Sequence, residues 1–198
     1  MKIISAILFR WPSDEKTPKV LAKVFDVSSF GFFQRSTVKQ WAVFFSSTII
    51  ERTKTSQRQS VAENDYICHA FVRYDGLSGA AICDKEYPSR VAFSFVNKIM
   101  DDFASKYSKV WDKENQKFDT TDLESDLEKF QDPKSVDKLT KIQKELDETK
   151  IIIRDTIESA LERGEKLDTL IDRSEILSNS SKQFYRTAKK QNQCCIIL

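Results

Sequence analysis

The sequence predicts an α+β fold: a mixed domain of strands and helices, followed by a long coiled-coil helix and a tail that carries a lipid. Three observations predict it. Apolar runs of strand and helix type alternate over the first two thirds of the chain, a seven-residue rhythm then runs for fifty-three residues, and the last four residues read Cys-Ile-Ile-Leu. They divide the 198 residues into a domain over 1–130, a linker over 131–138, a coiled-coil motif over 139–191 and a lipidation tail over 192–198.

The composition excludes several classes of protein. Hydrophobic residues make up 40%, charged residues 31%, and the net charge is +2. The N-terminal half has no basic stripe interleaved with aromatics, so we expect no nucleic-acid partner. The apolar start from Met1 to Arg10 is too short for a signal peptide, and no run approaches the ~20 apolar residues of a membrane span. We therefore expect a cytoplasmic protein.

Four stretches have the pattern of β-strands. Ile3 to Phe9 is a nearly continuous apolar run, which indicates a strand buried on both faces. Lys19 to Asp26 alternates more and can pair with it. Tyr66 to Tyr74 and Leu77 to Asp84 are joined by Asp75-Gly76, the strongest hairpin signal in the chain. The basic stretch from Arg52 to Ser60 is expected to be an exposed loop.

The first predicted helix is capped by Ser36 or Thr37 and reaches about Arg52. A helix on one face of a sheet needs only one apolar stripe. Here the apolar arc is wider, which indicates a second surface that another part of the protein covers. The residues of this arc are Trp41, Ala42, Val43, Phe44, Phe45, Thr48, Ile49 and Ile50.

Two further helices complete the domain. Pro88 begins one whose core side carries an apolar stripe from Ala92 to Phe103, and a short amphipathic helix is expected from Leu123 to Phe130. Cys68 and Cys83 lie in apolar runs without the spacing of a zinc site, so we expect small buried residues and no metal.

The coiled-coil motif is defined by a heptad stripe centred on Arg163. Steps of three and four residues reach sixteen layers, and a helix with this spacing supercoils with partner helices, here as a rod of roughly 80 Å. Several layers are small or polar, so the segment should be weakly structured alone and completed by partners. The layers flanking Arg163 are Leu139, Ile142, Leu146, Thr149, Ile153, Thr156, Ala160, Leu167, Leu170, Ser174, Leu177, Ser181, Phe184, Ala188 and Gln191.

Arg163 is the most informative of these residues. A guanidinium in a coiled-coil core costs several kcal/mol unless its donors find acceptors, which glutamines of partner helices in the same layer can supply. The alternative is an arginine that reaches solvent from a loose helix. Gly164 lowers helix stability by about 1 kcal/mol relative to alanine, so the segment has a place to bend beside the arginine.

The C-terminus predicts a membrane anchor. After Glu175 there is no acidic residue, and basic residues accumulate towards the end. Cys195 starts a C-a-a-X sequence, so it is the predicted prenyl acceptor, and Cys194 is available for a palmitoyl or second prenyl chain. Leu198 favours geranylgeranyl over farnesyl. Because one lipid binds only marginally, a second lipid would decide between soluble and anchored states.

Several motifs of the sequence resemble those of a known family. Ala160-Leu161-Glu162-Arg163-Gly164-Glu165-Lys166-Leu167 resembles the central-arginine motif of an R-SNARE. With Gln57-Arg58-Gln59-Ser60, Asp84-Lys85-Glu86-Tyr87-Pro88 and the Cys-Cys terminus, the whole chain resembles the prenylated longin R-SNAREs, which lack a transmembrane anchor. The resemblance implies a profilin-like longin domain with a five-stranded sheet. The fifth strand is left open between Lys85 to Tyr87 and a split early strand.

The resemblance also implies the partners. Arg163 would be the zero layer of a four-helix bundle with three Q-SNARE helices on an opposing membrane, which a disassembly ATPase and its adaptor would take apart. It implies a protein that is cytoplasmic or anchored peripherally on the cytosolic face of the Golgi, ER-derived vesicles, endosome or vacuole.

Two other functions fit parts of the sequence. A prenylated small GTPase has a similar length and C-terminus, but none of the four glycines lies in a phosphate-binding G-x-x-x-x-G-K-[ST] loop. A non-fusogenic trafficking adaptor could use the same sheet but would need neither the arginine-centred heptads nor the lipid site. We find no nucleophile-base-orienter set and expect neither catalysis nor a cofactor.

A prenylated protein that stays in solution must cover its lipid. The wide apolar arc of the first helix offers a surface, and Gly164 allows the heptad segment to fold back. We therefore expect a closed form in which part of 139–191 covers Trp41, Phe44 and Phe45, with Phe44 on the outer side of the helix. The resemblance likewise implies a self-inhibited longin form.

Overall fold

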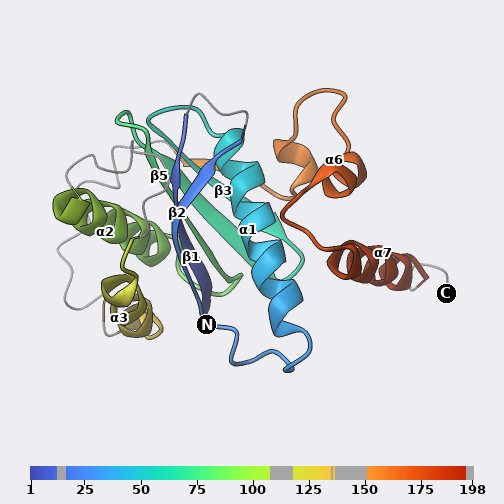
Figure 1. The fold of residues 1–198 in the computed structure, drawn as a ribbon, viewed down its shortest axis with the longest axis horizontal. Helices are drawn as coiled ribbons and strands as arrows, with labels where there is room; N and C mark the ends of the chain where they lie inside the picture. Colours follow the sequence, from blue (N-terminus) through green and yellow to red (C-terminus); the bar gives the residue numbers. More distant parts are fainter. Residues whose placement is uncertain (13–16, 108–117, 135, 137–150, 195–198) are drawn as a thin grey trace.

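A computed structural model describes residues 1–12, 17–107, 118–134, 136 and 151–194, the side chains of 188–194 excepted. Its centre is a six-stranded sheet of order β2-β1-β5-β4-β3-β6 (Figure 1). Neighbouring strands are antiparallel, except that β6 runs parallel to β3. The strands are β1 Ile3–Arg10, β2 Lys19–Phe25, β3 Gln57–Glu63, β4 Tyr66–Val72, β5 Leu77–Asp84 and β6 Ile151–Arg154.

The described helices lie in layers on the two faces of this sheet. The helix α1 (Arg35–Glu51) covers one face, while α2 (Ser89–Tyr107) and α3 (Thr121–Phe130) cover the other. A last layer lies along the side of α1 away from the sheet (Figure 1). It contains the short turn η2 (Glu158–Ala160), α6 (Leu167–Arg173) and α7 (Asn179–Cys194).

The sheet separates two apolar cores, and β1 contributes to both. Its side chains alternate, so that Ile7 and Phe9 pack with α1, whereas Ala6 and Leu8 pack with α2. A strand buried on both faces has no reason to alternate apolar with polar residues. The continuous apolar run predicted this position correctly.

The expectation that Arg52 to Ser60 forms an exposed loop was wrong for Gln57 to Ser60. Gln57–Glu63 is β3, the fifth strand of the domain, and Lys85 to Tyr87 is a turn. Two polar side chains of β3 make contacts with β4. The Arg58 guanidinium lies over the Phe71 ring, at 4.3 Å from the centroid. The Ser60 Oγ lies 2.9 Å from the Nδ1 of His69. Because these partners lie on the neighbouring strand β4, the polar residues of β3 do not by themselves indicate a strand.

The expected capping of α1 by Ser36 or Thr37 was also wrong. The helix begins at Arg35, after Gln34, and no side chain caps its first turn. The turn between β2 and α1 provides the backbone contact there, because the Gln34 N–H donates to the Gly31 carbonyl at 2.9 Å. Thr37 lies inside the helix, and its hydroxyl is 3.4 Å from the Ser181 hydroxyl.

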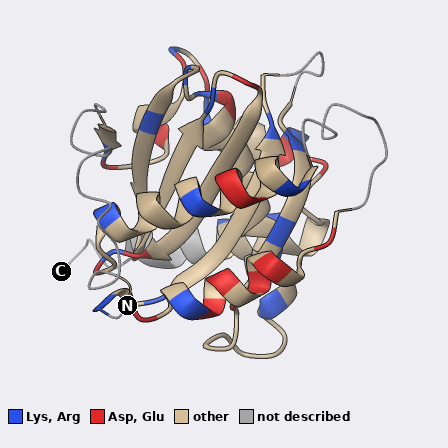
Figure 2. Cartoon of the chain, turned by 90° about the vertical axis from the view of Figure 1, so that its left-hand side faces the viewer, with Lys and Arg blue, Asp and Glu red and all other residues tan. Residues whose placement is uncertain are grey.

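The surface of α2 and α3 carries interspersed charges of both signs (Figure 2). Lys98 bridges Asp102 and Asp126, and Lys106 bridges Asp119 and Asp122. Such pairs on a solvated face contribute little individually. No helix within the described ranges is both long enough and apolar enough to cross a bilayer.

The cysteines of the sheet behave as expected from their neighbours. Cys68 and Cys83 are both fully buried, free thiols. Burial raises the pKa of Cys68 to about 12. Such a thiol stays protonated and packs as a small apolar side chain.

We predict that His69 makes the domain sensitive to acid. Burial lowers its pKa from 6.5 to about 4, so between these values the unfolded chain binds a proton that the folded one does not. Stability should fall as pH drops from 6.5 to about 4, by up to about 3 kcal/mol from this residue. Urea unfolding across this range should show a smaller pH dependence for His69→Gln, and an identical dependence in both proteins would contradict the assignment.

Candidate functional site

The C-terminal half of α1 is buried around its whole circumference. From Ala42 to Ile50 every residue is buried, although a helix that packs only on a sheet buries one stripe. The sheet side is marked by Ser46, whose Oγ lies 4.0 Å from the Sγ of Cys68. The opposite side must therefore be covered by something other than the sheet.

The C-terminal segment covers that outer side. Phe44 lies two positions from Ser46, about 200° around the helix, and is only 5% exposed. On the same side, Trp41 stacks on Tyr185 with ring centroids 4.9 Å apart, and its indole N–H donates to the Ser181 carbonyl at 3.4 Å. The Trp41, Phe44 and Phe45 surface thus packs beneath residues of the heptad segment.

An ion pair joins the C-terminal end of α1 to the same segment. The Arg52 guanidinium donates two hydrogen bonds to the Glu165 carboxylate, of 2.9 and 2.7 Å. Its side chain is 6% exposed, and it also donates to the Thr48 carbonyl and the Glu51 carboxylate. The hydrogen bond from Arg52 lowers the pKa of Glu165. Because a bidentate pair fixes both distance and orientation, it holds the turn at Glu165 in one position.

The heptad segment also extends the sheet. The strand β6 pairs in parallel with β3, with Ile151 opposite Arg58 and Arg154 opposite Val61. Just after it, the Ile157 N–H donates to the Glu63 carboxylate at 3.2 Å. In this conformation the described part of the motif therefore packs as part of the domain: it supplies one edge strand of the sheet and a layer that covers α1.

The described part of the segment is accordingly not one continuous helix in this conformation, and the 80 Å rod stays a prediction for the form bound to partner helices. The segment turns at Arg163 and Gly164, where Gly164 has a φ of +94° and the Glu165 N–H donates to the Glu162 carbonyl. Arg163 is exposed in this turn. The breaks allow Leu167 and Ile171 to become buried against α1, which a straight rod would not permit.

The predicted layers divide into three groups. Buried here are Ala160, Leu167, Leu177 and Ser181; Leu170 and Ser174 are partly buried; Ile153, Thr156, Arg163 and Phe184 are exposed. Ala188 and Gln191 lie in α7, where side chains are not described, and Leu139, Ile142, Leu146 and Thr149 lie outside the described residues.

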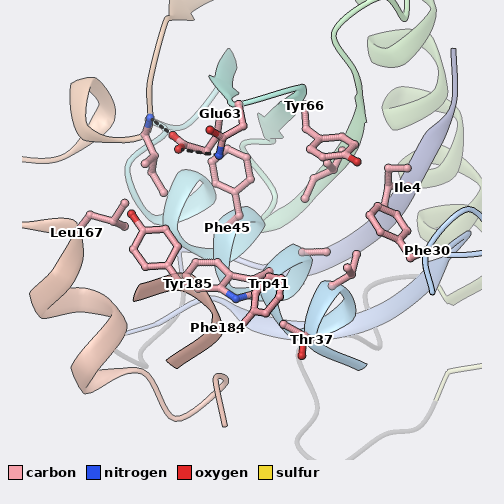
Figure 3. A pocket seen from close by; sticks show the side chains of 15 residues that line it. Ile4, Phe30, Thr37, Trp41, Phe45, Glu63, Tyr66, Leu167, Phe184 and Tyr185 are labelled. Carbon is pink, nitrogen blue, oxygen red and sulfur yellow. Dashed lines mark hydrogen bonds between the residues drawn. The ribbon is translucent and has the colours of Figure 1, made fainter. Parts of the chain in front are cut away.

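An apolar cavity of about 280 Å³ lies between α1, the sheet edge and the covering layer (Figure 3). Trp41, Phe45, Leu167 and Tyr185 form much of its wall. Burial raises the pKa of Tyr185 to about 12, so its hydroxyl stays neutral. The cavity is slightly below the ~300–1,000 Å³ of typical small-molecule sites, and its lining suits an apolar guest.

The helix α7 ends at the first of the two predicted lipidation cysteines. Cys194 is its last residue, while Cys195 to Leu198 lie outside the described residues. On the exposed side of α7, Arg186 pairs with the Asp172 carboxylate, and the Lys182 ammonium donates to the Asp172 carbonyl. The start of α7 is thereby joined to α6 as well as to α1.

Two family models together match most of the chain. A longin model, described as a regulated-SNARE-like domain, matches residues 27–127, and a synaptobrevin model matches residues 138–196. A synaptobrevin homolog of Schizosaccharomyces pombe is 46% identical over the full length of both chains. The chain belongs to the longin-domain synaptobrevins. Other homologs of this group are 48% identical in Yarrowia lipolytica, over 90% of this chain and 91% of the relative, and 49% identical in Debaryomyces hansenii, over 87% and 88%.

This longin-domain synaptobrevin is therefore an R-SNARE of the membrane-fusion machinery. The longin match begins after β2 and ends in α3, and the synaptobrevin match includes β6, α6 and α7. In this R-SNARE the fusion motif is packed onto its own longin domain.

Sequence reasoning did not identify several contact residues of this R-SNARE. Arg52 and Glu165 appeared only as charged residues of a loop and a helix. Ile157, Ile171 and Tyr185 lie beside the heptad stripe and also pack against α1 or the sheet. Apolar residues adjacent to a stripe are the signal for a second interface, because a simple bundle helix needs only its a and d positions.

We predict that Glu165→Gln loosens the covering layer of this R-SNARE. The variant removes the charge from the Arg52 pair and leaves a buried guanidinium with fewer acceptors, so local opening should become about tenfold easier. Amide hydrogen exchange of β6 and α6 should accelerate accordingly. The matched control Glu162→Gln changes an exposed carboxylate of the same turn and should leave amide exchange as in the wild type. Equal protection of β6 and α6 in all three proteins would show that the Arg52–Glu165 pair does not hold the covering layer in place.

Proposed function

We propose that this R-SNARE alternates between the closed form described above and an open form whose 139–191 helix zips with three Q-SNARE helices. One observation carries the proposal: Leu167, Leu177 and Ser181 belong to the heptad stripe and are also buried against the longin domain. A layer residue cannot face α1 and the centre of a four-helix bundle at once. Closure and assembly therefore exclude each other.

The energetics favour a switch that partners can operate. Burial of an apolar side chain is worth roughly 1.5–3 kcal/mol, and the closed form buries Leu167, Ile171 and Leu177. A bundle that buries all sixteen layers, each against three partner helices, offers more area than α1 does. In the absence of Q-SNAREs the closed form is favoured, and assembly draws the segment off the longin domain.

Arg163 is the proposed zero layer of the open form. In the closed form it lies exposed at a turn and needs no acceptor from the protein. In the bundle it would be buried, and glutamine amide oxygens from the partners would accept its hydrogen bonds without a second charge. The polar layer then sets the register of the four helices.

The lipid is the proposed guest of the cavity. Cys195 would carry the prenyl chain and Cys194 a palmitoyl or second prenyl chain. Cys194, the last residue of α7, lies nine residues after Tyr185, about 14 Å along the helix, so a prenyl chain attached beyond it would reach the cavity by running back along α7. Opening would release the lipid and the heptads together, so that anchoring and assembly occur on the same membrane.

The proposed cycle defines the remaining partners. The membrane is reached through the lipids, the Q-SNAREs through the heptads, and a disassembly ATPase with its adaptor would return the chain to the closed form. The cytosolic faces of the Golgi, ER-derived vesicles, endosome or vacuole are the proposed sites of action. The proposal assigns the chain neither a catalytic step nor a cofactor, and membership of the R-SNARE family favours fusion over the GTPase and adaptor alternatives.

Phe44→Glu tests the closed form. A carboxylate beneath the covering layer costs several kcal/mol, whereas in the open form it would reach water on the outer side of α1. We expect a larger radius of gyration by small-angle scattering and a larger membrane-bound fraction of the lipidated protein, with an unchanged longin fold. Adding Cys195→Ser should abolish the membrane binding but keep the expansion.

The control for this test is Tyr74→Glu, which adds the same charge at a residue 83% exposed in the β4–β5 hairpin. It should leave compactness and membrane binding unchanged. If the Phe44 variant is as compact as the wild type while circular dichroism shows both folded, Phe44 is not part of the closure.

Arg163→Leu tests the zero layer. The closed form should be unaffected, because the side chain is exposed there. The complex with Q-SNAREs should lose roughly 1–3 kcal/mol for each partner amide left unsatisfied, measured as a lower thermal midpoint of the purified complex. Arg173→Leu, which removes an exposed arginine outside the stripe, is the control; equal midpoints for the two variants would refute the layer assignment.

A further inference from the structure

The turn between β2 and α1 displays two aromatic side chains to solvent. Phe32 is 78% exposed and Phe33 is 93% exposed. Their rings contact each other edge to face, with centroids 5.5 Å apart, and they therefore form one apolar projection. Two adjacent, nearly fully exposed phenylalanines are not needed for the core, since Phe30 of the same turn already packs against it.

The turn is held in place by hydrogen bonds. The Arg35 guanidinium donates to the Phe30 carbonyl at 3.1 Å, and the Phe30 N–H donates to the Val27 carbonyl at 3.1 Å. At its start the Ser28 hydroxyl donates to the Asp26 carboxylate at 2.6 Å. A turn fixed in this way cannot fold its rings inward, so their exposure is built into the fold.

Two exposed basic residues follow the aromatic pair in the chain, while the acidic Asp26 lies at the start of the turn. Residues 27–50 contain Arg35 and Lys39 but no Asp or Glu. Residues 176–198 contain four basic residues and no acidic one. The two segments lie side by side, because the Ser181 hydroxyl is 3.4 Å from that of Thr37 and Trp41 stacks on Tyr185 (Figure 1). The parts of these acid-free segments that make the two contacts, residues 37–41 and 181–185, therefore lie next to each other.

We propose that the Phe32–Phe33 turn is a membrane contact of the longin domain, which inserts between the headgroups of an anionic bilayer. Aromatic rings at the tip of a fixed turn match the interfacial region, and nearby cations match anionic lipid headgroups. The projection is only two rings wide with polar neighbours, whereas a stable protein interface needs a patch of about 800 Å² per partner. This contact goes beyond the lipid anchor and does not require it.

Vesicle co-sedimentation of the full-length, unlipidated chain tests the proposal. The wild type should bind vesicles of phosphatidylcholine with phosphatidylserine better than phosphatidylcholine alone, and added salt should weaken the binding. Phe32→Ser with Phe33→Ser should reduce binding to the anionic vesicles about tenfold. Tyr74→Ser, an equally exposed aromatic of the β4–β5 hairpin, is the matched control and should bind like the wild type.

Insertion itself has a separate readout. The indole emission of a Phe33→Trp variant should shift to shorter wavelength on adding anionic vesicles, and brominated lipids should quench it more than they quench the wild type. Equal sedimentation of the wild type and the double serine variant would overturn the proposal. So would a concentration-dependent dimer that the double variant abolishes, because the rings would then bind a second copy. Since no lipid is attached, these results are independent of the closed form tested by Phe44→Glu.

Discussion

The structure depends on the burial of both sides of α1. One side packs on the sheet, as in any layered α/β domain, and the other side bears Trp41 and Phe44, which water would hydrate at a large cost if nothing covered them. The chain covers them with its own C-terminal segment. Every other feature of the covering layer follows from this constraint: the edge strand β6, the turn at Gly164 and the Arg52–Glu165 pair all hold the segment where Leu167 and Tyr185 can reach α1.

The same requirement is the physical basis of the proposed switch between two forms. The heptad segment is poor in large apolar layers, so alone it gains little from being a rod, and it accepts breaks where Gly164 and Ser174 permit them. Its apolar residues gain burial on α1 instead. A partner bundle offers the same residues a larger surface in a straight helix. Layers of small or polar residues would destabilise a simple coiled coil. In the proposed switch they keep the two forms close in free energy, so that the binding of partners or lipids can shift the equilibrium.

The functional groups are gathered on one side of the molecule, although they are far apart in the chain. The cavity, the start of α7 and the turn bearing Phe32 all lie near the N-terminal half of α1. The opposite face, formed by α2 and α3, carries mixed charges in ion pairs. The first face thus carries the apolar cavity and the exposed phenylalanines, while the other is an ordinary solvated surface.

The sequence by itself determined the class of the fold, four of the strands of the domain and the excess apolar surface of α1, because each depends on local periodicity. It did not determine β3, whose arginine, glutamines and serine look like a loop until Phe71 and His69 are placed beside them. Nor did it determine the path of the heptad segment, since the same spacing serves a rod and a wrapped chain. Only the tertiary structure decided between them, because the burial that decides the path comes from residues more than a hundred positions away.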